Sequence, residues 1–305
     1  MSPPSRAAGN GAGIALMFGA AFTFASVDAL AKHLSDDFPT LQLVWFRFFF
    51  HVAFMLLVFG PVMRARLWRA ANMRWQIGRG ALLITTTVLS YTSLSLMPLA
   101  EFTAIAFVAP LVVTILAARF LGEKVGFARW CAVLAGFAGV LVIIRPGGAL
   151  FGWQALVPLA MATIYAVFQI LTRKFAGADD PVTTLFFTGL TGAVIASLLV
   201  PFAWKTPSVD EWPLLACLGL LGGGGHLLLI LAFQRVPASA LAPISYMQLV
   251  FATVLGIVVA HHVPDRLTLI GMGLIALAGL FGAALQGLAS RRPRPPDEAD
   301  IPISD

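Results

Sequence analysis

Residues 91–123, YTSLSLMPLAEFTAIAFVAPLVVTILAARFLGE, join two apolar runs at Pro98 with almost no loop between them. The same design returns in residues 230–262, ILAFQRVPASALAPISYMQLVFATVLGIVVAHH. At an offset of 139 residues, Pro98 aligns with Pro237. The chain is therefore predicted to use one unit twice, and a unit doubled inside a membrane is a recurrent plan of transporters.

The similarity between the two segments extends along the chain. Phe107 aligns with Tyr246 at the same offset, and AFTFASVDALAKHL from Ala21 aligns with ATIYAVFQILTRKF from Ala162 at an offset of 141. Small insertions in loops explain the drift of the offset. The alternative explanation is that apolar composition alone produces the likeness.

Composition sets the class of protein. Of the 305 residues, 59% are hydrophobic and only 11% are charged, whereas a soluble domain carries about 25% charge. A membrane-spanning helix needs about 20 mostly apolar residues, and the chain has several runs of that kind. A transmembrane β-barrel would instead show short alternating segments. We therefore predict an all-α polytopic membrane protein that is embedded in the lipid bilayer.

The apolar runs predict ten transmembrane helices. Their approximate ranges are 11–32, 40–60, 78–97, 99–121, 127–144, 153–174, 182–204, 212–235, 238–260 and 268–287. Each half holds five spans, an odd number, so the second half enters the membrane from the opposite face and the repeat is inverted. We assign residues 1–146 to the first five-helix repeat and 147–288 to the second. Residues 289–305 are charged and proline-rich, and we expect a disordered cytoplasmic tail.

The positive charges predict the orientation. With the N-terminus in the cytoplasm, 15 of the 20 Lys and Arg residues fall in cytoplasmic segments, as the positive-inside rule requires. Both termini are then cytoplasmic in a multi-pass protein of the cell inner membrane. The net charge of +6 is explained by this topology, so we expect no nucleic-acid partner.

The order of these features resembles the drug/metabolite transporter superfamily, in its ten-span branch with two EamA-type domains. The features are WFRFFF around Arg47, the helix pair with Pro98 and Pro110, GE at residues 122–123, and AGFAGV at residues 135–140. The second half departs from this pattern, since His261 and His262 replace the GE pair. The resemblance implies export or exchange of small metabolites, with amino acids, including aromatic ones, as a recurrent cargo.

Charged residues inside spans are costly and are the first candidates for function. Asp28 and Arg47 lie at similar depth on adjacent helices, where an ion pair is reasonable. The pair could bind a zwitterionic substrate, form an outer gate, or only lock two helices. His51 follows Arg47 by one turn and could relay a proton with Asp28 or only hydrogen-bond inside the bundle. Lys32 is interpreted as a snorkelling residue at a helix end.

Three further polar positions are gating or cavity candidates. His226 directly follows four glycines near the middle of its span, which suits a substrate site, although tight helix packing would also explain the glycines. Thr87 is its partner in the repeat alignment. Glu101 is either an outer-gate group or an acid that stabilises a helix start.

The remaining cavity candidates are aromatic or amide side chains. Tyr91, Tyr165 and Tyr246 lie deep in their spans, where they could stack on a planar substrate or simply belong to the core. Gln169 and Gln248 could hydrogen-bond a ligand, and Gln169 occupies the repeat position of Asp28.

These features together predict a secondary transporter that exports small metabolites, most plausibly amino acids, by alternating access. The alternatives are another cargo (nucleotide-like, a vitamin or a drug) in either direction, or a membrane subunit without transport. No catalytic motif is present, so we expect no enzyme, and neither a cofactor nor a metal site. Proton coupling is left open, with Asp28, Glu101 and His226 as carriers. We expect a monomer.

Overall fold

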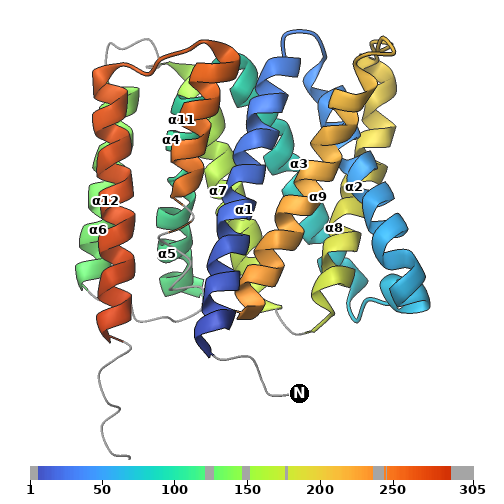
Figure 1. Cartoon of the computed structure of the whole chain (residues 1–305), viewed down its shortest axis with the longest axis horizontal. Helices are drawn as coiled ribbons and strands as arrows, with labels where there is room; N and C mark the ends of the chain where they lie inside the picture. The colour runs from blue at the N-terminus through green and yellow to red at the C-terminus, as the bar shows by residue number, and fades with distance from the viewer. Residues whose placement is uncertain are drawn as a thin grey trace, which may run out of the picture.

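The computed structural model describes residues 6–120, 127–145, 152–175, 178–235, 244 and 246–289. All regular structure in these residues is helical (Figure 1). The first half holds α1 (Arg6–Leu34), α2 (Thr40–Met63), η1 (Arg64–Trp68), α3 (Met73–Leu96), α4 (Leu99–Ala106), α5 (Ala109–Phe120) and α6 (Phe127–Ile144). The second half holds α7 (Trp153–Lys174), α8 (Pro181–Leu199), η2 (Val200–Ala203), α9 (Trp212–Arg235), α11 (Met247–Ala260) and α12 (Arg266–Ala289).

The length and apolarity of the helices confirm a multi-pass membrane protein. Within the described residues, six helical stretches can cross a bilayer: Gly11–Leu34, Thr40–Trp68, Leu99–Leu116, Trp153–Thr172, Pro181–Ala203 and Trp212–Ala232. Three shorter apolar helices are Leu134–Ile144, Met247–Val259 and Arg266–Ala278. In Figure 1 α1 begins and α12 ends at the lower edge of the bundle. We call this the inner end and the opposite one the outer end, following the predicted orientation.

The helix α3 is the most polar of the long helices, and its polar face is buried in the bundle. Its buried polar residues include Thr86, Thr87, Ser90 and Ser93. Three of these hydroxyls, on Thr86, Thr87 and Ser93, donate to the carbonyl of the preceding turn, which satisfies them without a distant partner. Because α7 and α8 pack against this helix, its polar face lies against protein and not against lipid.

The predicted span 99–121 contains two helices, because the chain breaks in its middle. The helix α4 ends at Ala106, and α5 begins at Ala109. Pro110 has no N–H for a continuous helix and disfavours helical geometry in the residue before it. The N–H groups of Leu111 and Val112 both donate to the carbonyl of Val108 and start a new helix there. Pro243, in the predicted span 238–260, lies outside the described residues.

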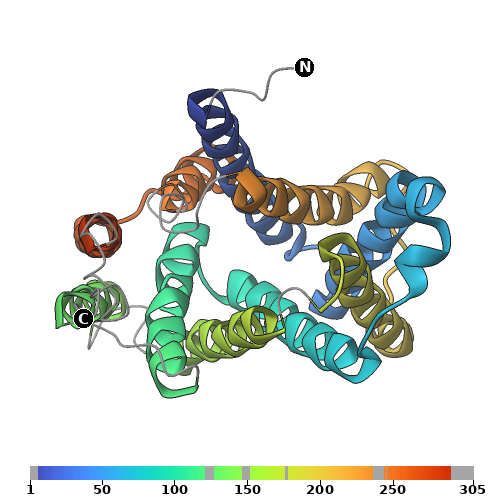
Figure 2. The same ribbon diagram turned by 90° about the horizontal axis from the view of Figure 1, so that it is seen from below.

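Helices of the two halves pack in corresponding pairs (Figure 2). The helix α1 packs on α9 and α11, and its counterpart α7 packs on α3 and α5. Likewise α2 packs on α9, and α8 packs on α3. Two pairs of equivalent helices meet directly: α2 with α8, and α6 with α12. The middle of the bundle is therefore enclosed by helices from both halves.

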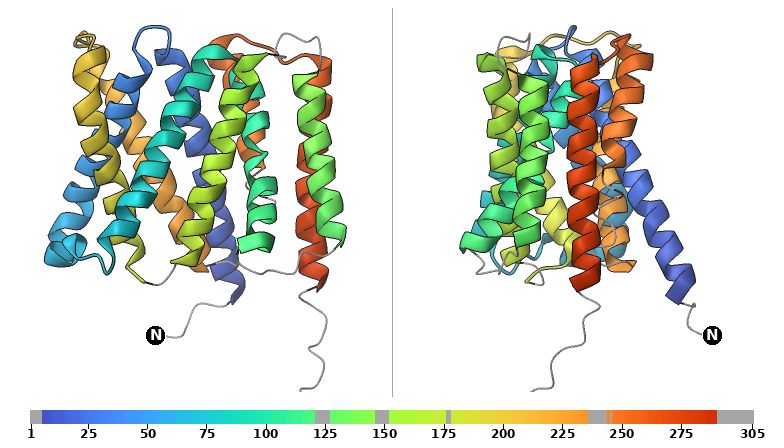
Figure 3. Two further views of the ribbon diagram at one scale, coloured as in Figure 1. Left: turned by 180° about the vertical axis from the view of Figure 1, so that it is seen from behind. Right: turned by 90° about the vertical axis from the view of Figure 1, so that its left-hand side faces the viewer.

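The α6–α12 contact is a close backbone approach between the halves, and Figure 3 shows the pair at one edge of the bundle. A Cβ on Gly139 would lie 2.8 Å from the carbonyl oxygen of Gly271, and a Cβ on Gly271 would lie 2.6 Å from that of Gly139. Only glycine at both positions permits this approach, a device common between membrane helices.

Candidate functional site

Arg47 is the central group of the candidate site. Its Nη1 donates to the Tyr91 hydroxyl at 3.4 Å, and its guanidinium carbon lies 5.7 Å from the centre of the Tyr91 ring. The helices α2 and α3 bring these two side chains together. Tyr165, on α7, lies within electrostatic range of Arg47. The positive charge thus lies near one tyrosine from each half.

Asp28 has its own neutral partner. The Gln248 side-chain amide, in the first turn of α11, donates to Asp28 Oδ2 at 3.4 Å. Asp28 is within electrostatic range of Arg47, yet no ion pair within 4 Å joins these two described residues. The direct Asp28–Arg47 ion pair expected from the sequence is therefore absent, because Tyr91 and Gln248 bind the two charges separately.

Two histidines complete the polar centre. His226 Nδ1 lies 3.0 Å from the Gly222 carbonyl oxygen, and the ring meets Phe24 edge-on with centroids 4.9 Å apart. A carbonyl can only accept, so Nδ1 carries the hydrogen and Nε2 of the neutral ring is an acceptor.

The sequence-predicted relay between His51 and Asp28 is not seen. His51 lies within electrostatic range of His226 and Arg47 instead. Its Nε2 is buried without a hydrogen-bond partner among the described residues.

The glycines on α9 make room for these side chains. A Cβ on Gly222 would lie 3.6 Å from Arg47 Nε, and one on Gly225 would lie 2.9 Å from Phe24 Cε1. A Cβ on Gly223 would lie 3.2 Å from Phe54 Cδ1. The glycine run therefore serves close helix packing and also borders the polar centre.

The other predicted cavity residues differ in their contacts. Tyr246 stacks on Phe107 with ring centroids 5.1 Å apart. Thr87 is buried one turn before Tyr91 and donates to a carbonyl of its own helix. Gln169 lies half-buried on α7 and makes no side-chain hydrogen bond with the residues that the structure describes.

Glu101 and His262 form an inter-half contact that sequence reasoning missed. Glu101 Oε1 lies 3.1 Å from His262 Nε2, and the Glu101 side chain is only 7% exposed. The other carboxylate oxygen, Oε2, is buried without a hydrogen-bond partner among the described residues. The one sequence feature that could have indicated this contact is His262 itself, because it lies where the second half departs from the repeat.

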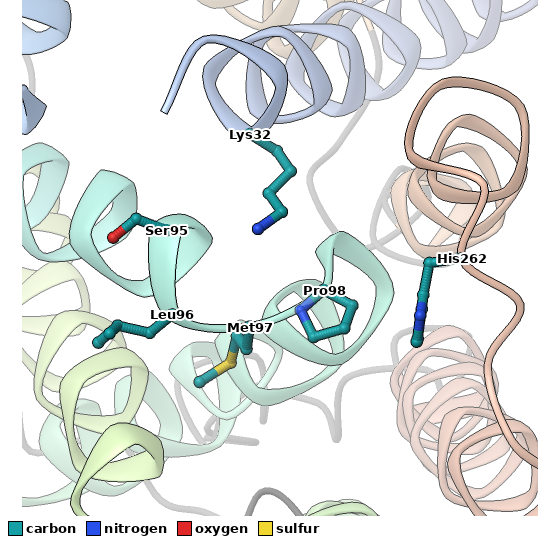
Figure 4. A pocket seen from close by; sticks show the side chains of 6 residues that line it. All are labelled: Lys32, Ser95, Leu96, Met97, Pro98 and His262. Carbon is teal, nitrogen blue, oxygen red and sulfur yellow. The ribbon is translucent and has the colours of Figure 1, made fainter. Parts of the chain in front are cut away.

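Next to this contact is a cavity of about 310 Å³ at the outer end (Figure 4). Its lining residues are Lys32, Ser95, Leu96, Met97, Pro98 and His262. Figure 4 shows the Lys32 side chain extended into this space. Lys32 therefore lines a cavity, whereas the sequence interpretation had it snorkelling to the membrane surface.

A second polar network joins the halves at the inner end. The Gln76 amide donates to Asp179 Oδ2 at 2.7 Å, and Arg79 Nη1 donates to Gln76 Oε1 at 3.1 Å. Arg79 Nε also donates to the Thr172 hydroxyl at 3.0 Å. Arg79 was counted only as a topology signal in the sequence, and here it is a buried link between α3 and α7. Among the described residues no three His, Cys, Asp or Glu side chains could hold a metal ion.

Comparison with known proteins identifies the family. The sequence profile of the EamA-like transporter family matches residues 11–145 and again residues 152–284. The chain is 31% identical over 257 residues to an S-adenosylmethionine uptake transporter of Rickettsia bellii, covering 83% of this chain and 87% of that protein. It is 26% identical to a riboflavin transporter of Vibrio cholerae, covering 91% and 95% of the two chains.

Two more comparisons agree with this family and fold. The pseudopaline exporter CntI of Pseudomonas aeruginosa is 26% identical over 271 residues, covering 87% of this chain and 94% of the exporter. One solved crystal structure has the same fold, with a TM-score of 0.68 at 22% identity over 93% of this chain and 99% of its own. The resemblance predicted from the sequence is thus confirmed. The chain belongs to the EamA-like transporter family and is a multi-pass membrane transporter.

Proposed function

We propose that this transporter moves a zwitterionic α-amino-acid metabolite that carries a planar ring, the chemical class of S-adenosylmethionine. The observation that carries the proposal is the arrangement of Asp28 and Arg47. Two opposite charges lie within electrostatic range in the middle of the bundle, and each is bound by a neutral side chain instead of by the other.

Charges inside a membrane protein are costly and persist where they pair or bind cargo. A substrate carboxylate can accept two hydrogen bonds from the Arg47 guanidinium. Such a two-bond contact is stronger than the single hydrogen bond to a tyrosine hydroxyl. A substrate ammonium can replace the Gln248 side-chain amide as the hydrogen-bond donor to the Asp28 carboxylate. One zwitterion therefore neutralises both charges, and the two neutral partners are released to bind other polar atoms of the ligand.

The rings around the charges favour a planar group on the same ligand. Tyr91, Tyr165 and Phe24 belong to this region, and aromatic rings stack on planar groups. The Nε2 atom of His226 supplies an acceptor for an amino group on such a ring. S-adenosylmethionine combines an α-amino acid with an adenine ring, and the Rickettsia bellii relative is named for its uptake.

The path across the membrane follows the repeat. We infer ten spans in a 5+5 inverted repeat, with repeats over residues 1–146 and 147–288, both termini in the cytoplasm of the inner membrane, and alternating access between the halves. The corresponding contacts of α1 with α9 and of α7 with α3 support this arrangement. Export of amino acids stays a prediction, since one relative is named for uptake and another for export. Proton coupling and a monomeric state also stay predictions.

Proteoliposomes that contain only this protein test the proposal. Labelled S-adenosylmethionine, phenylalanine and riboflavin are loaded separately, and flux is measured in both directions with and without a pH gradient. We expect saturable flux of the amino acids, lost in Asp28→Asn and in Arg47→Gln. Arg235→Gln, which removes an exposed charge at the end of α9, is the matched control. Flux of riboflavin alone, unaffected by Asp28→Asn, would overturn the zwitterion assignment.

A further inference from the structure

The outer cavity lies between the two halves and is separate from the polar centre around Arg47. Its walls are the end of α1, the junction of α3 with α4, and His262 after α11. Its volume of about 310 Å³ falls at the small end of the range for ligand pockets. Ser95 and Leu96 are exposed, so the cavity is open to its surroundings at the outer end.

Lys32 gives the cavity an unpaired positive charge. Its ammonium extends into the cavity (Figure 4), and it forms no ion pair with any residue that the structure describes. A second cavity of about 250 Å³ shares Lys32 and is lined also by His33, Asp36 and Val259. Asp36 is four residues from Lys32, yet no ion pair within 4 Å joins them. An ammonium without a partner beside a cavity is suited to bind an anionic group.

The junction of α3 and α4 adds to the positive character of the cavity. Pro98 precedes the first turn of α4, whose first N–H groups have no acceptor inside the helix. The partial positive charge of a helix start favours an anion there. Glu101 lies in this first turn, but its carboxylate turns to His262. Glu101 therefore holds the His262 ring in the wall of the cavity and leaves Lys32 free for a ligand.

We infer that the outer cavity is a second binding site, in which Lys32 binds the carboxylate of the transported metabolite before it reaches, or after it leaves, the Arg47 centre. The apolar side chains of Leu96 and Met97 line the same cavity and can contact the body of the ligand. Only the identity of the ligand rests on the proposed function. The carboxylate chemistry of the site follows from the cavity and from Lys32.

The chain has only four lysines, Lys32, Lys124, Lys174 and Lys205, which makes a direct test practical. Reductive methylation with labelled formaldehyde adds two ¹³C-methyl groups to each lysine and keeps its charge. Carbon NMR of the full chain in detergent then shows one signal for each lysine, assigned by replacing each with arginine. Lys205 is the internal control, because it lies at the outer end and donates to the Asp37 carbonyl.

The probes are S-adenosylmethionine, acetate, and 5′-methylthioadenosine, which is the same nucleoside without the amino-acid portion. We expect saturable movement of the Lys32 signal with the first two probes and none with the third. In proteoliposomes, Lys32→Gln should raise the half-saturation concentration about tenfold, the effect of losing one charge-assisted hydrogen bond. Lys32→Arg should restore it, and Lys205→Gln should leave it unchanged.

The outcomes separate this site from the proposed function. Movement of the Lys32 signal with acetate but without S-adenosylmethionine transport supports the site and rejects the cargo. If the Lys32 signal does not move while transport depends on Asp28, the second site is overturned and the proposed function stands. Equal movement of the Lys32 and Lys205 signals indicates non-specific binding and overturns the site, as does a fixed Lys32 signal with both carboxylate probes.

Discussion

Phe107 and Tyr246 stack on each other with ring centroids 5.1 Å apart and ring planes inclined by 24°. They are equivalent residues of the two halves, 139 positions apart. One occupies the break between α4 and α5, and the other directly precedes α11. The two halves therefore touch through the same position of the repeated unit, close to the middle of each doubled helix.

This stack predicts a measurable coupling between the two residues. In a double-mutant cycle of Phe107→Ala and Tyr246→Ala, we expect a coupling of about 0.5–1.5 kcal/mol in the free energy of unfolding, since stacked rings contribute that much beyond their burial. Reversible unfolding in mixed micelles measures it. A cycle of Phe107→Ala with Phe281→Ala, whose ring is exposed on α12, should be additive. Additivity in both cycles would mean that the stack contributes nothing.

Arg47 should not tolerate lysine, although the charge is kept. A lysine ammonium cannot present the planar fork that binds a carboxylate through two hydrogen bonds. We expect Arg47→Lys to raise the half-saturation concentration for a zwitterionic cargo about tenfold. Tyr91→Phe, which removes only the hydroxyl that Arg47 donates to, should change it much less. If Tyr91→Phe is as damaging as Arg47→Lys, the tyrosine has a direct role in binding.

Neighbouring glycines of α9 should respond in opposite directions to alanine. A Cβ on Gly225 would lie 2.9 Å from Phe24, whereas a Cβ on Gly224 has no atom within 4 Å. Gly224→Ala should raise stability by about 0.5–1 kcal/mol through backbone entropy. Gly225→Ala should lower it by about 1–3 kcal/mol through overpacking. Thermal unfolding in detergent compares them, and equal midpoints would show that Phe24 moves aside at no cost.

Asp265, in the connection before α12, predicts a loss of stability in acid. The Thr268 N–H and the Arg145 guanidinium lower the pKa of Asp265 to about 2, from an ordinary value of about 3.9. A carboxyl with a lowered pKa contributes stability that is present above its ordinary pKa and is lost as the pH falls toward the folded-state value. Unfolding midpoints measured from pH 5 downward should therefore fall in this window.

The variant Asp265→Asn should lack this part of the pH dependence. Asp36→Asn removes an exposed carboxyl at the same end of the bundle, and it should behave like the parent chain. Identical profiles for the parent chain and Asp265→Asn would show that another carboxyl is responsible.

Breaking the contact of Glu101 with His262 should open the outer end. This contact joins α4 to the end of α11 across the two halves, and its loss shifts the population toward a state in which these helices part. In a chain without Cys131 and Cys217, Ser95→Cys reports access to the outer cavity. A membrane-impermeant maleimide should label it several-fold faster in Glu101→Gln. An unchanged rate would show that the contact does not restrain the outer end.

The class and family of the protein were predictable because their signals are local in the sequence. Long apolar runs, the arginine bias of the loops and the order of short motifs do not depend on distant contacts. The polar centre was partly predictable for the same reason. Asp28, Arg47 and His226 are costly inside a membrane wherever they lie, so the sequence alone marks each of them as a candidate for function.

The contacts among these residues could not be predicted, because they depend on how helices rotate against one another. The separate partners of Asp28 and Arg47 lie on α11 and α3, and no pattern in one sequence gives the rotation of those helices. Lys32 was misread because a lysine at a helix end looks the same whether it faces lipid or a cavity. The exact place of the break between α4 and α5 could not be predicted, because a proline near a helix start and one in a kinked helix look alike.

The mutual approach of Gly139 and Gly271 has a consequence for how the halves can move. It ties α6 to α12 along one edge of the bundle, while α2 and α8 meet at the opposite edge (Figure 2). The α6–α12 and α2–α8 contacts form two seams between the halves. If the halves rotate relative to one another, these seams are strained least when the rotation axis passes through both. Atoms near such an axis hardly move, whereas the inner and outer ends travel furthest. A cargo held between the seams would then stay almost still while the protein rotates around it.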